Sequence, residues 1–171
     1  KQMAEQLLSR TDVRACYMPQ NYEEMLELSM TPAEYLSEKG DREEQTWIRT
    51  CLGALKYTAE EMDHEISELS GGQKAKILLL KMSLSGADVL ILDEPTRGID
   101  VGAKYEIYCI INDLVAAGKS VIMISSELPE VLGMSDRIYI MNEGKFVGEV
   151  GKEEATSELI MSKIVKSGKG A

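Results

Sequence analysis

The stretch Leu-Ser-Gly-Gly-Gln-Lys at residues 69–74 has the composition of a helix start that can bind an anion. Ser70 is a favoured N-cap residue, and two glycines without Cβ atoms let backbone N–H groups approach a ligand closely. The unpaired N–H groups of the first turn and the helix dipole both favour negative charge, each such interaction contributing roughly 0.3–1 kcal/mol. Taken alone, however, Ser-Gly-Gly is more often an ordinary loop.

A second stretch, Val-Leu-Ile-Leu-Asp-Glu-Pro-Thr at residues 89–96, predicts a buried strand that ends in two carboxylates. Ligands of open α/β sheets bind at the carboxyl ends of strands, which is where Asp93 and Glu94 would lie. One carboxylate can hold a metal ion while the other polarises a water molecule. Such a pair alone is more often a helix start or a solvated turn. Together, the two stretches indicate nucleotide hydrolysis.

Length and composition set the class of protein. The chain has 171 residues and a formal net charge of −10, which suits one domain with a sizeable core and argues against a nonspecific nucleic-acid surface. Its three cysteines lie far apart without metal-ligand spacing, so free thiols in a reducing compartment are expected. No apolar run approaches the roughly 18–20 residues of a membrane span, and no signal peptide is visible. A cytoplasmic location is therefore expected.

Hydrophobic periodicity predicts an α/β fold with a mainly parallel sheet and an all-helical insert between about 21 and 69. Capping boxes predict helix starts at Thr31 and Thr58, and the apolar stripe that includes Trp47 is expected in the core. The strand at 120–125 is expected to be buried. The predicted strands are 13–18, 88–92 and 120–125, with a hairpin of 137–141 and 145–150; the other predicted helices are 1–9, 42–55, 72–84, 101–117, 128–132 and 153–165.

The segment from Ser70 to Gln73 resembles the signature of the ATP-binding cassette (ABC) ATPases, and residues 90–94 resemble the Walker B strand of that family. This resemblance implies a P-loop NTPase core with an inserted helical subdomain, ATP and Mg²⁺ as ligands, and ATP hydrolysis as the activity. It divides one ABC ATPase domain into a core helix and strand at 1–20, a helical subdomain with the signature at 21–87, and the Walker B core with the C-terminal hairpin and helix at 88–171.

The same resemblance assigns roles at the strand ends. Asp93 resembles the carboxylate that holds Mg²⁺ through water, and Glu94 resembles the general base for the hydrolytic water. Gln20, which follows the first strand, resembles the Q-loop glutamine that reaches the metal or the attacking water. Considered without the family, Gln20 is equally well read as a polar loop residue.

The resemblance also implies a partner, because the signature of one cassette covers the nucleotide that a second cassette holds. The residues that would bind the γ-phosphate in this way are Ser70, Gly71, Gly72 and Gln73. Asp100 occupies the D-loop position and would bridge the two cassettes, although a surface turn is a serious alternative for that stretch. Ser126 stands where the family has its switch histidine, and a hydroxyl cannot replace the charge-tuned hydrogen bond of an imidazole.

The P-loop pattern G-x-x-x-x-G-K-[ST] is missing from these residues. Gly118, Lys119 and Ser120 imitate its end, but the residue five positions before Gly118 is Asp113. The segment also connects a helix to a following strand, whereas a phosphate-binding loop runs from a strand into a helix. We expect the P-loop and its strand to have been cut off just upstream of the helix at 1–9, and the chain alone to be inactive because it lacks the phosphate-binding lysine and loop.

The resemblance changes along the chain. Residues 1–96 are similar to the second cassette of ABC-F proteins, which are soluble factors that act on ribosomes, and residues 97–171 are similar to the second cassette of ribose/xylose-type sugar importers. The change falls at residues 93–97, which suggests a natural or constructed chimera. The implied partners are a second cassette and either the ribosome or a membrane permease docked against residues 21–69. A permease would hold the chain at the inner face of the membrane, and a non-catalytic fragment that completes a partner's nucleotide site is the alternative.

Overall fold

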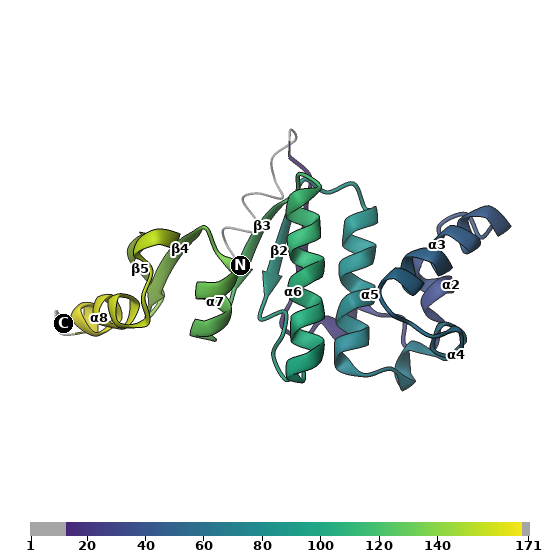
Figure 1. The fold of residues 1–171 in the computed structure, drawn as a ribbon, viewed down its shortest axis with the longest axis horizontal. Coiled ribbons are helices and arrows are strands. Elements are labelled where there is room, and N and C mark those ends of the chain that lie inside the picture. Colours follow the sequence, from purple (N-terminus) through teal and green to yellow (C-terminus); the bar gives the residue numbers. More distant parts are fainter. Residues whose placement is uncertain (1–12, 169–171) are drawn as a thin grey trace. The chain divides into compact units, whose positions relative to one another are not determined.

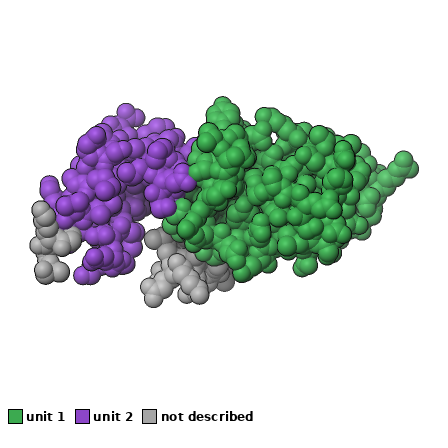
Figure 2. Space-filling view, turned by 90° about the horizontal axis from the view of Figure 1, so that it is seen from below, with its two compact units in different colours: residues 1–124 green, residues 125–171 purple. Residues whose placement is uncertain are grey.

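The structure is a computed structural model that describes residues 13–168. Two compact units make up the chain, the first ending at Ile124 and the second beginning at Ser125 (Figure 2). Within residues 13–168, no helix combines the length and the apolar character that a membrane span requires. The helix predicted at 1–9 lies outside the described residues.

A three-stranded parallel sheet forms the centre of the first unit, in the order β1 (Ala15–Met18), β2 (Val89–Asp93), β3 (Ser120–Ile124) (Figure 1). The predicted parallel α/β fold is therefore confirmed. The middle strand is the most buried, because it has a strand on each side and its leucines are fully enclosed. By contrast, β3 lies at the edge of the described sheet and the Ile124 side chain is 44% exposed, so the prediction of a buried strand is wrong there.

Two helices lie side by side next to this sheet, α5 (Gly71–Leu84) and α6 (Val101–Ala116) (Figure 1). Each begins at a side chain that accepts a hydrogen bond from the first turn, Ser70 for α5 and Asp100 for α6. Because α5 precedes β2 and α6 follows it, both helices begin near the carboxyl edge of the sheet (Figure 1). The chain thus brings two helix starts and two strand ends together.

The helical insert between β1 and α5 contains the 3₁₀ turns η1 (Tyr22–Met25) and η2 (Ile66–Glu68) and the helices α2 (Pro32–Leu36), α3 (Arg42–Ala54) and α4 (Ala59–Asp63). The capping boxes predicted at Thr31 and Thr58 are confirmed, and they open α2 and α4. On α3, Ile48 and Leu52 are buried, but the Trp47 side chain is 52% exposed. The prediction that Trp47 lies in the core is wrong, because the buried face of this helix centres on the line from Ile48 to Leu52.

The second unit consists of α7 (Leu128–Met134), the antiparallel strands β4 (Arg137–Asn142) and β5 (Lys145–Gly151), the turn η3 (Lys152–Glu154) and α8 (Ser157–Gly168). The predicted hairpin is confirmed. Its tip, Glu143 and Gly144, has φ values of 49° and 76°, as a two-residue type I′ turn requires. One face of the hairpin packs its buried side chains against α8, and the helix predicted at 153–165 begins only at Ser157, after η3.

Candidate functional site

The carboxyl edge of the parallel sheet carries three of the residues singled out from the sequence. Asp93 is the last residue of β2, Glu94 follows it, and Gln20 follows β1. The register pairs Met18 with Leu92, so Gln20 and Glu94 each lie two residues beyond the same pair. Parallel strands bring their carboxyl ends to one edge of the sheet, and this topology places an amide and two carboxylates there together.

A hydrogen bond from the neighbouring strand holds the Asp93 side chain. Tyr17 on β1 donates its hydroxyl to Oδ2 of Asp93 at 2.9 Å. Burial of the ring and the nearby Asp93 carboxylate raise the pKa of Tyr17, so the hydroxyl keeps its proton at neutral pH. The hydrogen bond occupies Oδ2 and leaves Oδ1 for another ligand. Sequence reasoning did not identify Tyr17, because nothing local marks a tyrosine within a strand as a carboxylate partner.

The backbone at Glu94 has an unusual conformation. Its φ is 52°, in the left-handed region that residues other than glycine rarely adopt, and its N–H donates to the Ile124 carbonyl at 2.8 Å. Such strain costs on the order of 1–3 kcal/mol and is concentrated at functional sites. The tight turn continues with the Arg97 N–H donating to the Glu94 carbonyl at 3.1 Å. This turn ends β2 abruptly and presents Glu94 at the edge of the sheet.

A polar hollow of about 330 Å³ adjoins this turn and is lined by Gln20, Asn21 and Arg97. Arg97 is exposed, and its guanidinium makes no ion pair with the carboxylates of the described residues. The sequence analysis gave Arg97 no role. The signal available in the sequence was a cation only four positions after Asp93, at the end of a strand.

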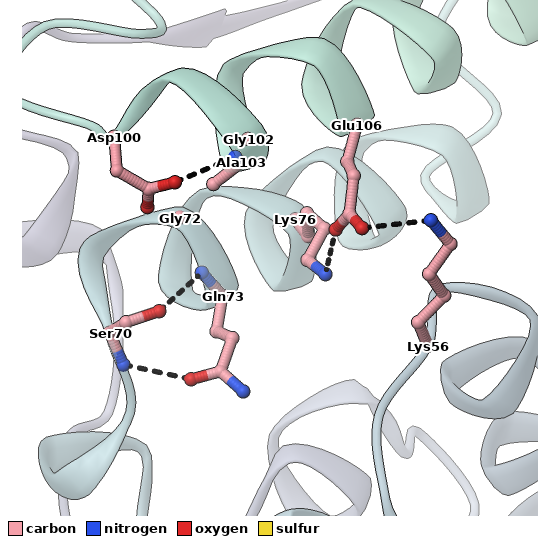
Figure 3. A pocket seen from close by; sticks show the side chains of 9 residues that line it. All are labelled: Lys56, Ser70, Gly72, Gln73, Lys76, Asp100, Gly102, Ala103 and Glu106. Carbon is pink, nitrogen blue, oxygen red and sulfur yellow. Dashed lines mark hydrogen bonds and ion pairs between the residues drawn. The ribbon is translucent and has the colours of Figure 1, made fainter.

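A second hollow, of about 370 Å³, lies where α5 and α6 begin (Figure 3). The backbone N–H of Ser70 donates to the side-chain oxygen of Gln73 at 2.9 Å, and the Ser70 hydroxyl accepts from the Gln73 N–H at 3.3 Å. Helix geometry leaves the N–H groups of Gly71 and Gly72 without an acceptor inside the helix. The residues that line this second hollow are Lys56, Ser70, Gly72, Gln73, Lys76, Asp100, Gly102, Ala103 and Glu106.

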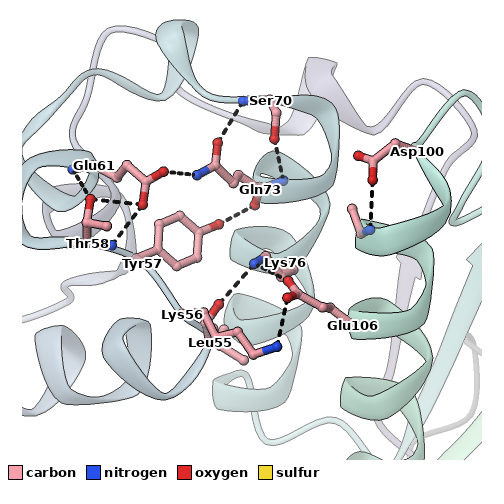
Figure 4. A network of polar contacts seen from close by, with 11 residues as sticks. Leu55, Lys56, Tyr57, Thr58, Glu61, Ser70, Gln73, Lys76, Asp100 and Glu106 are labelled. Atoms are coloured by element: carbon pink, nitrogen blue, oxygen red, sulfur yellow. Dashed lines mark hydrogen bonds and ion pairs between the residues drawn. The ribbon is translucent and has the colours of Figure 1, made fainter.

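Gln73 also connects the start of α5 to the helical insert (Figure 4). Its side-chain nitrogen donates to the Glu61 carboxylate at 2.7 Å, and its backbone carbonyl accepts a hydrogen bond from the Tyr57 hydroxyl. Burial raises the pKa of Tyr57, so this hydroxyl remains a donor at neutral pH. One hydrogen bond thereby ties the start of α5 to Glu61 on α4, and the other ties it to Tyr57, which precedes α4.

The two glycines of the signature differ in their surroundings. Gly71 is exposed, and a Cβ built on it would meet only the Tyr22 hydroxyl at 3.7 Å. Gly72 is buried, and a Cβ there would lie 2.6 Å from the Ala103 Cβ. Close contact between α5 and α6 therefore requires glycine at position 72, a packing reason that the sequence alone did not reveal. Gly71 has the open space that a ligand needs.

Replacing Gly72 with alanine is expected to lower the free energy of unfolding by about 2 kcal/mol. The new methyl group would overlap Ala103, and neither helix can move aside without disturbing its other contacts. Urea denaturation measures the loss. Gly71→Ala is the matched control and is expected to leave stability unchanged, because its Cβ meets no close neighbour.

A compensating substitution tests the cause of that loss. Adding Ala103→Gly to Gly72→Ala removes the facing methyl group and is expected to recover most of the lost stability. Equal destabilisation by Gly71→Ala and Gly72→Ala, or a double variant no more stable than Gly72→Ala alone, would contradict the packing explanation.

The other predicted site residues cap helices or lie elsewhere. Asp100 accepts a hydrogen bond from the Ala103 N–H at 3.0 Å, which caps α6 at the rim of the second hollow (Figure 3). Ser126 lies in the second unit, before α7, where the Glu127 N–H donates to the Ser125 hydroxyl at 3.0 Å. The carboxyl edge of the sheet thus carries Gln20, Asp93 and Glu94. The second hollow is lined by Ser70, Gly72, Gln73 and Asp100 but not by Gly71, and Ser126 belongs to the second unit.

The donor set at the sheet edge fits a magnesium ion that arrives with a nucleotide. The part of the chain that the structure describes has no group of three or more histidine, cysteine, aspartate or glutamate side chains arranged to hold a metal on their own. Mg²⁺ in nucleotide sites is usually held by one or two carboxylates together with phosphate oxygens. Asp93, with Oδ1 left for another ligand, and the adjacent Glu94 supply such carboxylates.

The chain resembles known proteins in sequence over much of its length. A family model described as ABC transporter matches residues 1–97. The L-arabinose transport ATP-binding protein AraG of Geobacillus stearothermophilus is 59% identical over 103 residues, which are 60% of this chain and 20% of that protein. The galactose/methyl galactoside import ATP-binding protein MglA of Clostridium tetani is 61% identical over 114 residues, which are 67% of this chain and 23% of that protein.

A longer alignment joins the chain to the ribose import ATP-binding protein RbsA of Caldanaerobacter subterraneus, which is 46% identical over 133 residues, covering 78% of this chain and 27% of that protein. The chain therefore spans about a quarter or less of the length of these relatives. The comparisons do not show the resemblance of residues 1–96 to ABC-F proteins.

Solved structures share the fold. A nucleotide-free ATP-binding cassette from an ABC transporter has a TM-score of 0.72 at 22% identity, covering 92% of this chain and 69% of that one. A dimeric post-hydrolysis cassette bound to ADP and Pi has a TM-score of 0.68 at 17% identity, covering 82% and 63%. The chain belongs to the ABC transporter family, as an ATPase cassette homologous to the ATP-binding proteins of sugar importers.

Proposed function

We propose that this chain is part of the ATP-binding subunit of a monosaccharide importer and that the carboxyl edge of its sheet acts on MgATP. The observation that supports the proposal is the register of β1 and β2, which pairs Met18 with Leu92, so that Gln20 and Glu94 each follow this pair by two residues. In the proposed reaction Asp93 would hold Mg²⁺, which would neutralise phosphate charge. Glu94 accepts a proton from the water that attacks the γ-phosphate, and Gln20 orients that water.

The choice of an importer rests on the relatives. Their names describe arabinose, xylose, ribose and galactose transport or import. Since residues 97–171 number only 75, an alignment of 133 residues must include a substantial part of the first 96. This favours a single importer-type cassette over a chimera that carries a ribosome-acting half.

The proposed partners are a second cassette and a membrane permease. The dimeric cassette bound to ADP and Pi supports pairing of cassettes. In such a pair, Ser70, Gly71, Gly72 and Gln73 would contact the γ-phosphate of a nucleotide that the other cassette holds, and Asp100 would lie at the junction. The exposed Gly71 with its unpaired N–H fits that role. Docking to a permease would place the chain on the inner face of the membrane.

ATP turnover by this chain alone is expected to be absent, because none of its residues form the lysine-containing P-loop that binds the β- and γ-phosphates. A phosphate-release assay measures this in the 171-residue chain and in a fusion that adds the strand and P-loop of a related cassette before residue 1. Turnover is expected only in the fusion. Turnover by the chain alone would contradict the expected inactivity, and a folded fusion that neither binds nor hydrolyses ATP would contradict the proposed function.

A further inference from the structure

Tyr17 and Asp93 lie on neighbouring parallel strands and on the same face of the sheet. The register places Tyr17 opposite Ile91, so Asp93 is two residues farther along β2. Side chains two residues apart on a strand share a face, and a tyrosine is long enough to span that diagonal. The Tyr17 hydroxyl does so, donating to Oδ2 of Asp93 at 2.9 Å.

We propose that Tyr17 is a positioning residue for the metal-binding carboxylate of Asp93. By donating to Oδ2, Tyr17 restricts rotation of the carboxylate and leaves Oδ1 for the cation. This inference rests on the proposed function, which assigns Asp93 to Mg²⁺. Carboxylates that bind metals are commonly held by such hydrogen bonds, and loss of the outer partner lowers metal affinity by about 10–100-fold.

The chemistry of the donor suits this role. A tyrosine hydroxyl is neutral and brings no charge to the carboxylate, whereas an arginine or lysine would compete with the cation for it. Among the described residues, no lysine or arginine forms an ion pair with Asp93.

Tyr17 also joins two parts of the site. It lies three residues before Gln20 on the strand that leads into the Gln20 turn. The hydrogen bond from Tyr17 to Asp93 therefore links β1 to the last residue of β2. A purely structural role for this bond would affect stability and leave cation affinity unchanged, which separates the two explanations.

The test uses the P-loop fusion with a non-hydrolysable ATP analogue, and the Mn²⁺ dependence of analogue binding, measured by equilibrium dialysis, reports the affinity of the site for the cation. Asp93→Asn identifies the part of the Mn²⁺ dependence that belongs to this site. Tyr17→Phe keeps the ring and removes only the hydroxyl, and it is expected to weaken the Asp93-dependent binding of Mn²⁺ about tenfold. Tyr105→Phe, on the exposed surface of α6, is the matched control and is expected to bind Mn²⁺ like the unmodified fusion.

The outcomes separate this inference from the proposed function. If analogue binding by the fusion does not depend on Mn²⁺, or if Asp93→Asn leaves that dependence unchanged, the metal assignment and the role of Tyr17 both fail. If Asp93→Asn removes the dependence while Tyr17→Phe binds Mn²⁺ as tightly as the unmodified fusion or more tightly, only the role of Tyr17 fails. Adding Tyr17→Phe to Asp93→Asn is expected to have no further effect on Mn²⁺ binding, because the two residues act on one ligand.

Discussion

Glu94→Gln is expected to lower ATP turnover by the P-loop fusion about 10²–10⁴-fold, the range typical for loss of a general base. The amide has nearly the same size as the carboxylate but cannot accept the proton of the attacking water. The strained backbone at Glu94 holds the side chain at the carboxyl edge of the sheet, and an amide there keeps the same φ. We therefore expect kcat to fall while KM for ATP changes little, as measured by steady-state phosphate release.

The matched control is Glu158→Gln in the exposed first turn of α8, which removes an equal charge from the second unit. Turnover by this variant is expected to match that of the unmodified fusion. A Glu94→Gln fusion that retains more than a tenth of the turnover would show that another group accepts the proton. A rise in KM with kcat unchanged would instead assign Glu94 to nucleotide binding.

The elements that local chemistry determines were predictable from the sequence. Thr31, Thr58 and Ser70 each stand three residues before a glutamate or glutamine, and each opens a helix in the structure. The apolar run before Asp93 predicts a buried strand, and parallel pairing places its end at the carboxyl edge of the sheet. These features depend on residues within a few positions of one another, so the sequence pattern contains them.

Other features depend on contacts between distant parts of the chain and could not be predicted. Tyr17 and Asp93 are 76 positions apart, and only the register of β1 and β2 brings them together. Gly72 is required by Ala103 on another helix, and no local pattern reports how closely two helices pack. For Trp47 the sequence pattern predicted burial, but the residue is exposed, because an apolar residue beside a buried stripe can remain outside the core.

The burial of Lys76 likewise depends on distant residues and could not be predicted from the sequence. A lysine in a helix is normally exposed, but Lys76 on α5 is only 5% exposed and contacts both α6 and the helical insert. Its ammonium donates to the Glu106 carboxylate and to the Leu55 carbonyl, both at 2.9 Å, and lies 5.0 Å from the centre of the Tyr57 ring (Figure 4). Lys56 binds the other Glu106 oxygen at 2.9 Å. Together these contacts join the insert to α6.

Glu106→Gln is therefore expected to lower the free energy of unfolding by about 3 kcal/mol at neutral pH. The variant keeps the shape of the side chain but leaves the buried Lys76 ammonium without a counter-ion. Urea denaturation measures the loss. Asp63→Asn is the matched control, because it breaks the 2.7 Å ion pair with Arg49 between exposed side chains, and its stability is expected to equal that of the wild-type chain.

The pH dependence of this loss tests its electrostatic origin. Hydrogen bonds from Lys76 and Lys56 hold the pKa of Glu106 below its ordinary value. A carboxyl whose pKa is lower in the folded state contributes stability above its unfolded pKa, about 4.3, and that contribution is lost as the pH falls through the folded pKa. The stability difference between the wild-type chain and Glu106→Gln should therefore be constant near neutrality and shrink below about pH 4. A stability difference that stays constant into acid would assign the lost stability to packing. Adding Lys76→Met to Glu106→Gln should restore part of the stability only if the unpaired Lys76 ammonium is the cause.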